Sequence, residues 1–230
     1  MKKLIVFLVV VAAIVTAIAQ VVLPTFVSHQ MESLLGDKLH AESRYVDIQS
    51  SPAIKMASGQ IDSFVGEFEN AKLGKLNFAE VRVHVNHASV DPIQLIISQR
   101  VVLTGLGTGE IEGTITSQDL ESFMESSVKG LDNARVTVHD DTIELTGNID
   151  VGGFLRGKAT IAGVLAIKEN QLYFVPQRFA INGINVGGLN SALLKDVAIY
   201  DFSNFPIAAQ AERVVLENGE IHVFVTPGAN

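Results

Sequence analysis

The sequence predicts an α+β fold in which a highly curved antiparallel β-sheet wraps around amphipathic helices and follows an N-terminal hydrophobic helix. The chain opens with an apolar stretch of helical length, and two later segments repeat apolar residues at helical spacing. Most of the remainder alternates apolar and polar residues, as strands do. Glycines at positions 147, 152, 153, 157 and 163 fall inside expected strands, where glycine marks bulges and bends, so the sheet should curve.

The N-terminal segment has the composition of a signal peptide or a membrane anchor. Lys2 and Lys3 precede an apolar stretch from Leu4 to Leu23. About 20 helical residues span roughly 30 Å, the hydrocarbon thickness of a bilayer, whereas Ala17-Ile18-Ala19 fits the small-residue pattern at a signal cleavage site. We expect residues 4–23 to anchor the chain in the cytoplasmic membrane, with cleavage as the alternative. Either outcome places residues 24–230, a single domain, outside in the cell envelope.

A second helical stripe is predicted after Pro24, which should end or kink the apolar helix. This second helix runs from Thr25 to about His40. Its apolar residues recur at the spacing of one helix face, and they are Val27, Met31, Leu34, Leu35 and Leu39.

Alternating strand patterns and hairpin turns occupy much of the rest of the chain. Strands are expected at 45–48, 61–76 with an interruption at Gly74, 81–85, 101–103 and 111–115, with turns at His139-Asp140-Asp141, Glu169-Asn170 and Asn218-Gly219. The segment 90–97 fits either a short helix or a loop with a strand, and 189–197 resembles a short helix.

A central helix is predicted over residues 117–129. Thr116 and Asp119 resemble a capping box at its start, and Gly130 is a natural stop. One face of this helix is apolar and carries Leu120, Phe123, Met124 and Val128. This face packs either on an ordinary core or against a guest molecule that lies between the helix and the sheet.

Composition excludes several classes of partner and site. The formal net charge of −8 argues against a nucleic-acid partner and against docking on anionic lipid through a basic surface. The chain has no cysteine, which excludes disulfides, thiolate nucleophiles and cysteine-based metal sites. Any contact with lipid must therefore be mainly apolar.

No segment carries a convincing catalytic, metal or cofactor motif. His84 and His87 should point to opposite faces of a strand and cannot share an ion without a bulge. Asp140 and Asp141 fit turn chemistry better than acid–base catalysis. The stretch Gly105–Gly109 lacks the spacing of a phosphate-binding loop, and no G-x-S-x-G is present. We expect no catalytic residues, no metal and no cofactor.

Five segments, in this order, resemble the LmeA-type phospholipid-binding family of bacterial envelope proteins. They are SPAIKMASGQIDSFVGEFENAKLGKLNFAEVRVHVNHASVD (51–91), ITSQDLESFM (115–124), VTVHDDTIELTG (136–147), LYFVPQRFAINGINVG (172–187) and FSNFPIAAQAERVVLENGEIHV (202–223). The family is similar to the tubular lipid-binding superfamily, in which a curved sheet wraps a long helix beside an apolar groove. Glu121 departs from the family pattern, which has asparagine after the acidic residue and leucine.

The resemblance implies a non-catalytic protein that binds or transfers phospholipid, or another acyl lipid, at the membrane. Bent strands would leave a groove for acyl chains, and its candidate lining residues are Met31, Leu34, Leu35, Leu120, Phe123, Met124, Val128, Phe154, Leu172 and Phe174. Two alternatives stay open: an envelope assembly or scaffold protein that binds an unidentified protein partner, and a hydrolase of lipid or glycan.

Overall fold

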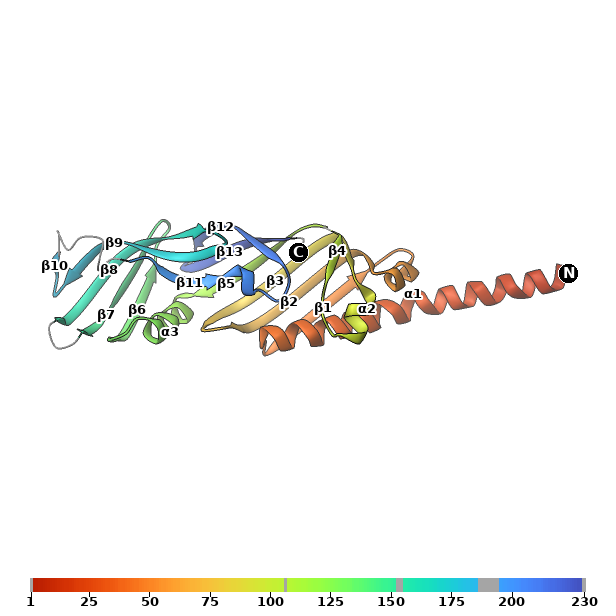
Figure 1. The fold of residues 1–230 in the computed structure, drawn as a ribbon, viewed down its shortest axis with the longest axis horizontal. Coiled ribbons are helices and arrows are strands. Elements are labelled where there is room, and N and C mark those ends of the chain that lie inside the picture. Colours follow the sequence, from red (N-terminus) through yellow and green to blue (C-terminus); the bar gives the residue numbers. More distant parts are fainter. Residues whose placement is uncertain (1, 106, 152–154, 186–194, 229–230) are drawn as a thin grey trace.

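The computed structural model describes residues 2–105, 107–151, 155–185 and 195–228. The molecule is elongated, and a long helix projects from one end of two β-sheets that follow one another along the long axis (Figure 1). Every strand pairing within the described residues is antiparallel. This arrangement confirms the predicted α+β class, with two sheets in place of one.

Helix α1 runs without interruption from Lys2 to Leu39 and contains Pro24. The prediction that Pro24 separates two helices is wrong. Proline removes one backbone donor, but the C-terminal half of α1 packs against neighbouring strands, which offsets the lost hydrogen bond. At its end, Arg44 donates to Asp37 at 2.7 Å, and Gly36 leaves room for the Arg44 side chain, whose Cδ would lie 2.5 Å from an added Cβ.

The first sheet contains seven strands in the order β1-β2-β3-β5-β13-β12, and β4 pairs with β3. Their bounds are β1 Ser43–Gln49, β2 Gln60–Leu73, β3 Leu76–Val90, β4 Leu103–Gly105, β5 Thr108–Thr116, β12 Ala209–Glu217 and β13 Glu220–Pro227. The 3₁₀ helix η1 (Ala53–Ser58) joins β1 to β2, and α2 (Pro92–Ile97) follows β3. Of the two alternatives for residues 90–97, the structure has the short helix.

The second sheet contains six strands in the order β10-β9-β8-β7-β6, with β11 paired to β9. Their bounds are β6 Leu131–Val138, β7 Ile143–Val151, β8 Leu155–Lys168, β9 Gln171–Ile181, β10 Ile184–Asn185 and β11 Val197–Asp201. All three predicted hairpins are confirmed. Of the helix expected over 189–197, residues 189–194 lie outside the described residues, and Val197 begins β11.

Two of the predicted bend glycines lie where another group comes very close. Gly163 coincides with a register shift between β8 and β9, and a Cβ there would lie 2.4 Å from the Val175 carbonyl oxygen. At Gly147, a Cβ would lie 2.6 Å from a methyl carbon of Leu131. Gly152 and Gly153 fall outside the described residues. At Gly163 glycine is required, because a side chain would collide with the backbone of β9.

The two sheets are joined by the β8–β9 turn and by an aromatic cluster. The side chain of Asn170 accepts a hydrogen bond from Ala211 N at 2.7 Å and donates one to the Ala209 carbonyl at 3.0 Å. Tyr200 packs edge-to-face on Phe78 of the first sheet and on Phe202 of η2 (Phe202–Asn204), with ring centroids 5.8 and 4.9 Å apart. These contacts hold β12 and β3 of the first sheet against the second.

Helix α3 (Ser117–Ser127) confirms the predicted central helix and its capping box. The Thr116 side chain accepts from Asp119 N, and the Asp119 carboxylate accepts from Thr116 N at 3.1 Å. On the side facing β6, Glu125 accepts from Ala134 N at 2.7 Å and Glu121 from Val136 N at 2.9 Å. The two carboxylates, one turn apart, therefore satisfy alternate donors of an edge strand.

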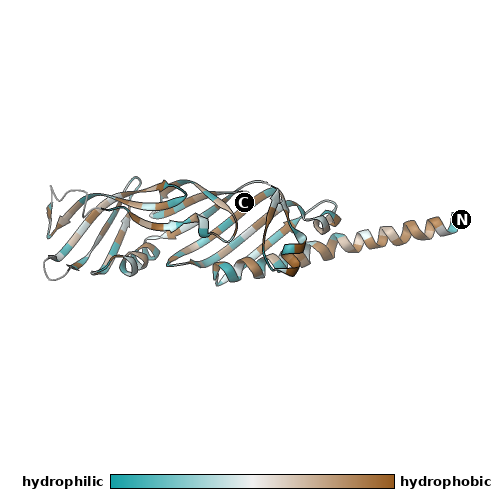
Figure 2. Ribbon diagram, in the orientation of Figure 1, coloured by the Kyte–Doolittle hydropathy of each residue, from teal (hydrophilic) through white to brown (hydrophobic). Residues whose placement is uncertain are grey.

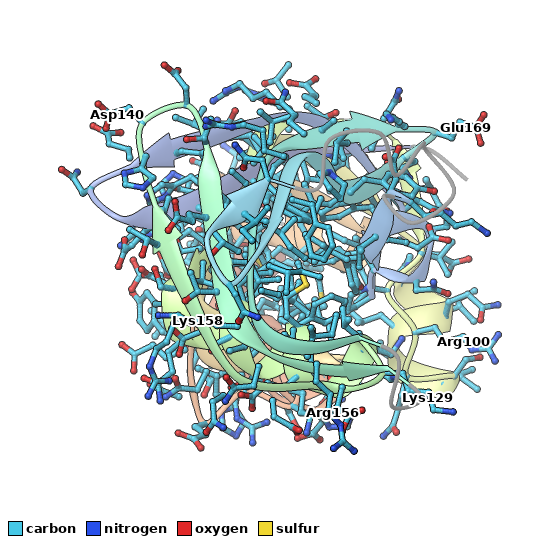
Figure 3. All side chains as sticks on the ribbon, turned by 90° about the vertical axis from the view of Figure 1, so that its left-hand side faces the viewer. Arg100, Lys129, Asp140, Arg156, Lys158 and Glu169 are labelled. Carbon is cyan, nitrogen blue, oxygen red and sulfur yellow. The ribbon has the colours of Figure 1, made fainter. Side chains whose placement is uncertain are left out.

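The core lies between the strands along the whole length of the two sheets. Viewed along the long axis, the strands surround a mass of packed side chains, while Arg100, Lys129, Asp140, Arg156 and Glu169 lie on the outside (Figure 3). The helices lie beside edge strands, α1 along β1 and α3 along β6. The inward faces of the first sheet and of α1 consequently meet, and that contact contains the candidate site.

We predict that Glu125→Ala lowers the free energy of unfolding by about 1–2 kcal/mol, because it leaves the partly buried Ala134 N–H without its acceptor. Glu125→Gln keeps an acceptor and should cost less. Urea unfolding followed by circular dichroism measures both. Ser122→Ala, on the exposed face of the same helix, is the control. An equal loss in the control and in Glu125→Ala would contradict the proposed role of the carboxylate.

Candidate functional site

The inward face of the first sheet is continuous and apolar. Cross-strand partners on this face include Phe64 with Val85 and Val83 with Ile111, and all four side chains are buried. The charged and polar residues of β3, such as Arg82 and His84, alternate outward. Alternation, which shifts phase at two points in β3, therefore directs hydrocarbon from several strands toward α1.

A narrow apolar slit lies between α1 and this face. It contains about 490 Å³ of space that is partly open to solvent, of which about 40 Å³ is wide enough for the centre of a water-sized sphere. Its lining residues come from α1, from the strands and from distant segments, and they are Met31, Leu35, Ile61, Phe64, Val83, Val85, Ala88, Val90, Val101, Leu103, Gly107, Ile207 and Pro227. None of these side chains carries a charge.

A wider apolar mouth lies next to the slit, between α1, η1 and α2. Its space amounts to about 750 Å³, partly open to solvent, and about 220 Å³ of it admits the centre of a water-sized sphere. Helix α1 contributes Leu23, Phe26 and Val27 to the lining, while Leu95 and Ile96 come from α2. Ile61 and Val90 line both spaces, so the mouth and the slit lie directly next to each other.

Polar contacts at the rim fix the elements that form the mouth. The side-chain amide oxygen of Gln20 (Oε1) accepts from Ala53 N at 3.1 Å, which ties η1 to α1. The Asp62 carboxylate accepts from Ser51 N at 2.8 Å and lies 3.4 Å from Lys55 Nζ. The Ser51 N–H, together with the Lys55 ammonium, lowers the pKa of Asp62. Helix α2 is capped by Asp91, which accepts from two backbone donors of its first turn.

A second, polar cleft lies near the end of α1 and the junction of the two sheets. Its space amounts to about 1110 Å³, partly open to solvent, and the residues that carry charge or can carry it are Lys38, His40, Lys72, Lys75, Tyr200 and Asp201. Hydrogen bonds from Ser203 lower the pKa of Asp201. Burial, with a smaller contribution from the Asp201 charge, raises the pKa of Tyr200 to about 12. The cleft therefore differs from the slit, because charged side chains line the cleft and none lines the slit.

The candidate groove residues of α1 and those of α3 lie in different parts of the structure. Met31 and Leu35 line the slit, and Leu34 is partly buried beside them. On α3, Leu120, Phe123 and Met124 are at most 4% exposed and pack in the core next to β6. Val128 lies just past the helix end and is half-buried. The α3 stripe therefore packs on protein and does not line the slit.

Two of the remaining candidates lie in the second sheet. Leu172 and Phe174 are fully buried in β9, away from the slit, and Phe154 lies outside the described residues. Sequence reasoning missed the sheet residues that form most of the lining, such as Phe64 and Val83. Their alternation was a usable signal for burial. Ile207 and Pro227 carried no signal, because only the folded chain brings them to the slit.

The polar residues considered for catalysis lie away from the slit. His84 and His87 are exposed on β3, and Asp140 with Asp141 occupy the exposed β6–β7 turn. Within the described part of the chain, no cluster of three or more His, Asp or Glu side chains has the geometry of a metal site.

We predict that Ala88→Leu is tolerated, while Ala71→Leu lowers stability by about 1–3 kcal/mol through overpacking. Both alanines are buried on the first sheet, but Ala88 borders the slit, whose space can receive the added atoms. Ala71 is fully buried and does not border it. Urea unfolding provides the comparison. Equal losses in the two variants would show that the slit is too narrow to accept side-chain atoms.

We also predict that η1 loosens in acid. The pKa of the Asp62 carboxyl is lower in the folded protein than in the unfolded chain, where it is about 4. The ionised carboxylate therefore stabilises the folded state at pH values above about 4, and this stabilisation is lost as the pH falls through the folded-state pKa. The protection factor for amide hydrogen exchange at Ser51, which is the intrinsic exchange rate at each pH divided by the observed rate, should therefore be high at neutral pH and fall at low pH. In Asp62→Asn the protection factor should be low at neutral pH as well. A high protection factor in this variant at pH 7 would contradict the assignment.

Comparison with known proteins gives one match. A model of the LmeA-like phospholipid-binding family matches residues 18–226, from within α1 to the last strand, β13. No curated protein and no solved structure matches the chain significantly. The match covers nearly the whole chain and includes the helix, the sheet face and the mouth described above. The chain belongs to the LmeA-like phospholipid-binding family.

Proposed function

We propose that this protein binds phospholipid non-catalytically, with an acyl chain lying in the slit between α1 and the first sheet. The observation that supports this proposal most directly is that the adjacent mouth and slit have no charged lining residue, in a chain of a phospholipid-binding family. Together they would form a path for an acyl chain, lined by apolar side chains except at Gln30, which is the environment that hydrocarbon requires.

The magnitudes favour the tails over the headgroup as the source of affinity. A tail with ~14 buried methylenes gains roughly 11 kcal/mol before the costs of ordering it. An exposed ion pair to a headgroup adds only ~0–1 kcal/mol. A protein with a formal net charge of −8 can therefore hold an anionic lipid, provided that hydrocarbon enters the slit.

The narrow part of the path must widen for a tail to occupy it. Met31 faces the sheet from α1 and has an unbranched side chain with a polarizable sulfur, which adapts to irregular partners. Leu35, one turn further along α1, lies on the same side of the slit. Rotation of these side chains, with a small movement of α1, would convert the slit into a channel.

The apolar N-terminal half of α1 supports a location at the membrane. Ile5–Leu39 is long and apolar enough to cross a bilayer, and its most apolar window has a mean hydropathy of 2.9 and contains no residue that is buried in the described protein. We propose that residues 4–23 anchor the chain in the cytoplasmic membrane and hold the domain at its outer side. The bound phospholipid would then come from the membrane that holds the protein.

Photocrosslinking tests this proposal. The full chain is reconstituted in vesicles that contain a phospholipid with a photoreactive group near the end of one tail, and crosslinked peptides are identified by mass spectrometry. We expect crosslinks in β2 and β3, around Phe64 and Val83, as well as in residues 4–23. Crosslinks confined to residues 4–23 would contradict binding in the slit.

Ala88→Leu adds side-chain atoms to the slit, and its crosslinking is compared with that of the unaltered protein. It should reduce crosslinking in β2 and β3 and leave crosslinking in residues 4–23 unchanged. Ala166→Leu adds the same side chain on β8 of the second sheet, away from the slit, and should behave like the unaltered protein.

A further inference from the structure

The end of the domain next to α1 carries a group of exposed apolar side chains. They come from three elements and are Phe26, Ile54, Ile93, Ile96 and Ile97, each between 53% and 77% exposed. We call this group the apolar rim. Helix α2 appears strongly hydrophobic beside α1 in Figure 2, close to where α1 leaves the sheets. Exposed isoleucines concentrated on one short helix need a partner, because isolated domains rarely expose such a group.

The length of α1 identifies that partner. Residues 4–23 rise about 30 Å, which is the thickness of the hydrocarbon core, so all of them are needed to cross it. The domain, however, already contacts α1 within this stretch. Gln20 is hydrogen-bonded to η1, and Leu23 lines the mouth. If residues 4–23 span the core, η1, α2 and the mouth must lie at its outer boundary.

We propose that the apolar rim is seated in the outer boundary of the bilayer hydrocarbon and that the mouth opens sideways into it. A phospholipid tail would then pass from the leaflet between η1 and α2 into the slit without crossing water. The partner is the bilayer that holds α1, and the inference rests on the proposed function.

The composition of the rim fits this placement. Phe26 lies on α1 directly after the anchor segment, so the surface of the rim is continuous with the exposed apolar surface from Ile5 to Val22. The polar groups near the mouth are largely paired with one another: Asp62 with Lys55, Gln20 with Ala53 N, and Asp91 with the α2 backbone. Groups already satisfied by protein partners need less water, which lowers the cost of bringing them to the membrane surface.

The absence of cysteine in the chain permits a direct depth measurement. A single cysteine replaces Ile97 of the rim or Asp140 in the exposed β6–β7 turn of the second sheet, and each carries an environment-sensitive fluorophore. In vesicles of the full chain, the Ile97→Cys probe should shift to the blue and be quenched by phospholipids with spin-labelled tails. The Asp140→Cys probe should do neither. Equal behaviour of the two probes would overturn the proposal.

The second measurement concerns entry through the mouth. Ala57 lines the mouth and is exposed, so Ala57→Trp can obstruct it without disturbing the core. Ser58→Trp adds the same ring at the neighbouring exposed position and is the matched control. The rate at which photoreactive phospholipid reaches β2 and β3 should fall by about tenfold or more in Ala57→Trp, which corresponds to ~1.4 kcal/mol or more in barrier height. The control should keep the original rate.

The outcomes separate this inference from the proposed function. If the unaltered protein shows no crosslinks in β2 or β3, lipid binding in the slit fails and the inference fails with it. If the unaltered protein is crosslinked there and both tryptophan variants keep its rate, phospholipid binds but does not enter through the mouth. Only slower labelling in Ala57→Trp alone, with the same final extent, supports entry from the leaflet.

Discussion

The continuity of α1 is the constraint on which the rest of the structure depends. One helix of 38 residues supplies both the exposed apolar segment and the face that covers the first sheet. Because a continuous helix transmits position along its axis, the depth of its N-terminal half in a membrane determines the height of the domain. Proline at position 24 would ordinarily weaken such a helix. Packing of the following turns on β1 and η1 keeps it intact.

The slit and the well-packed core are products of the same alternation, and they differ in what covers the sheet. Near β6, the α3 side chains Leu120 and Met124 pack against the rest of the protein and are at most 1% exposed. Under α1, the covering residues are Met31 and Leu35, and some space remains between them and the sheet. Protein interiors are normally packed to the density of organic crystals, so incomplete filling beside a wholly apolar surface is a functional signal.

The edges of the two sheets are protected by side chains that come from neighbouring elements. Glu121 and Glu125 of α3 accept from alternate N–H groups of β6, and Asn170 bonds the β12 backbone on both its donor and acceptor sides. Unprotected edges invite pairing with other chains. Glu121, which stands at a position where the resemblance led us to expect asparagine, accepts from the backbone N–H of Val136.

Local sequence was sufficient for those features that depend on local physics. The α+β class, the capping box of Thr116 and Asp119, the turn at Asn218-Gly219 and the apolar N-terminal segment all follow from periodicity and turn chemistry within short stretches. The resemblance to the phospholipid-binding family, carried by five ordered segments, is confirmed by the family match. Met31 and Leu35 were correctly singled out as residues of an apolar helix face, and both border the slit.

Only the tertiary structure decided what each apolar face packs against. Periodicity identifies a helix face that must be buried, but the apolar faces of α3 and α1 look alike in sequence. What each face packs against depends on the volumes of side chains from strands that are remote in sequence. Continuity through Pro24 was likewise decided by packing on β1. Ile207 and Pro227 reach the slit through pairings that span most of the chain, and Glu125 meets Ala134 only because β6 is an edge. Space between elements is a property of their joint packing, and no single segment encodes it.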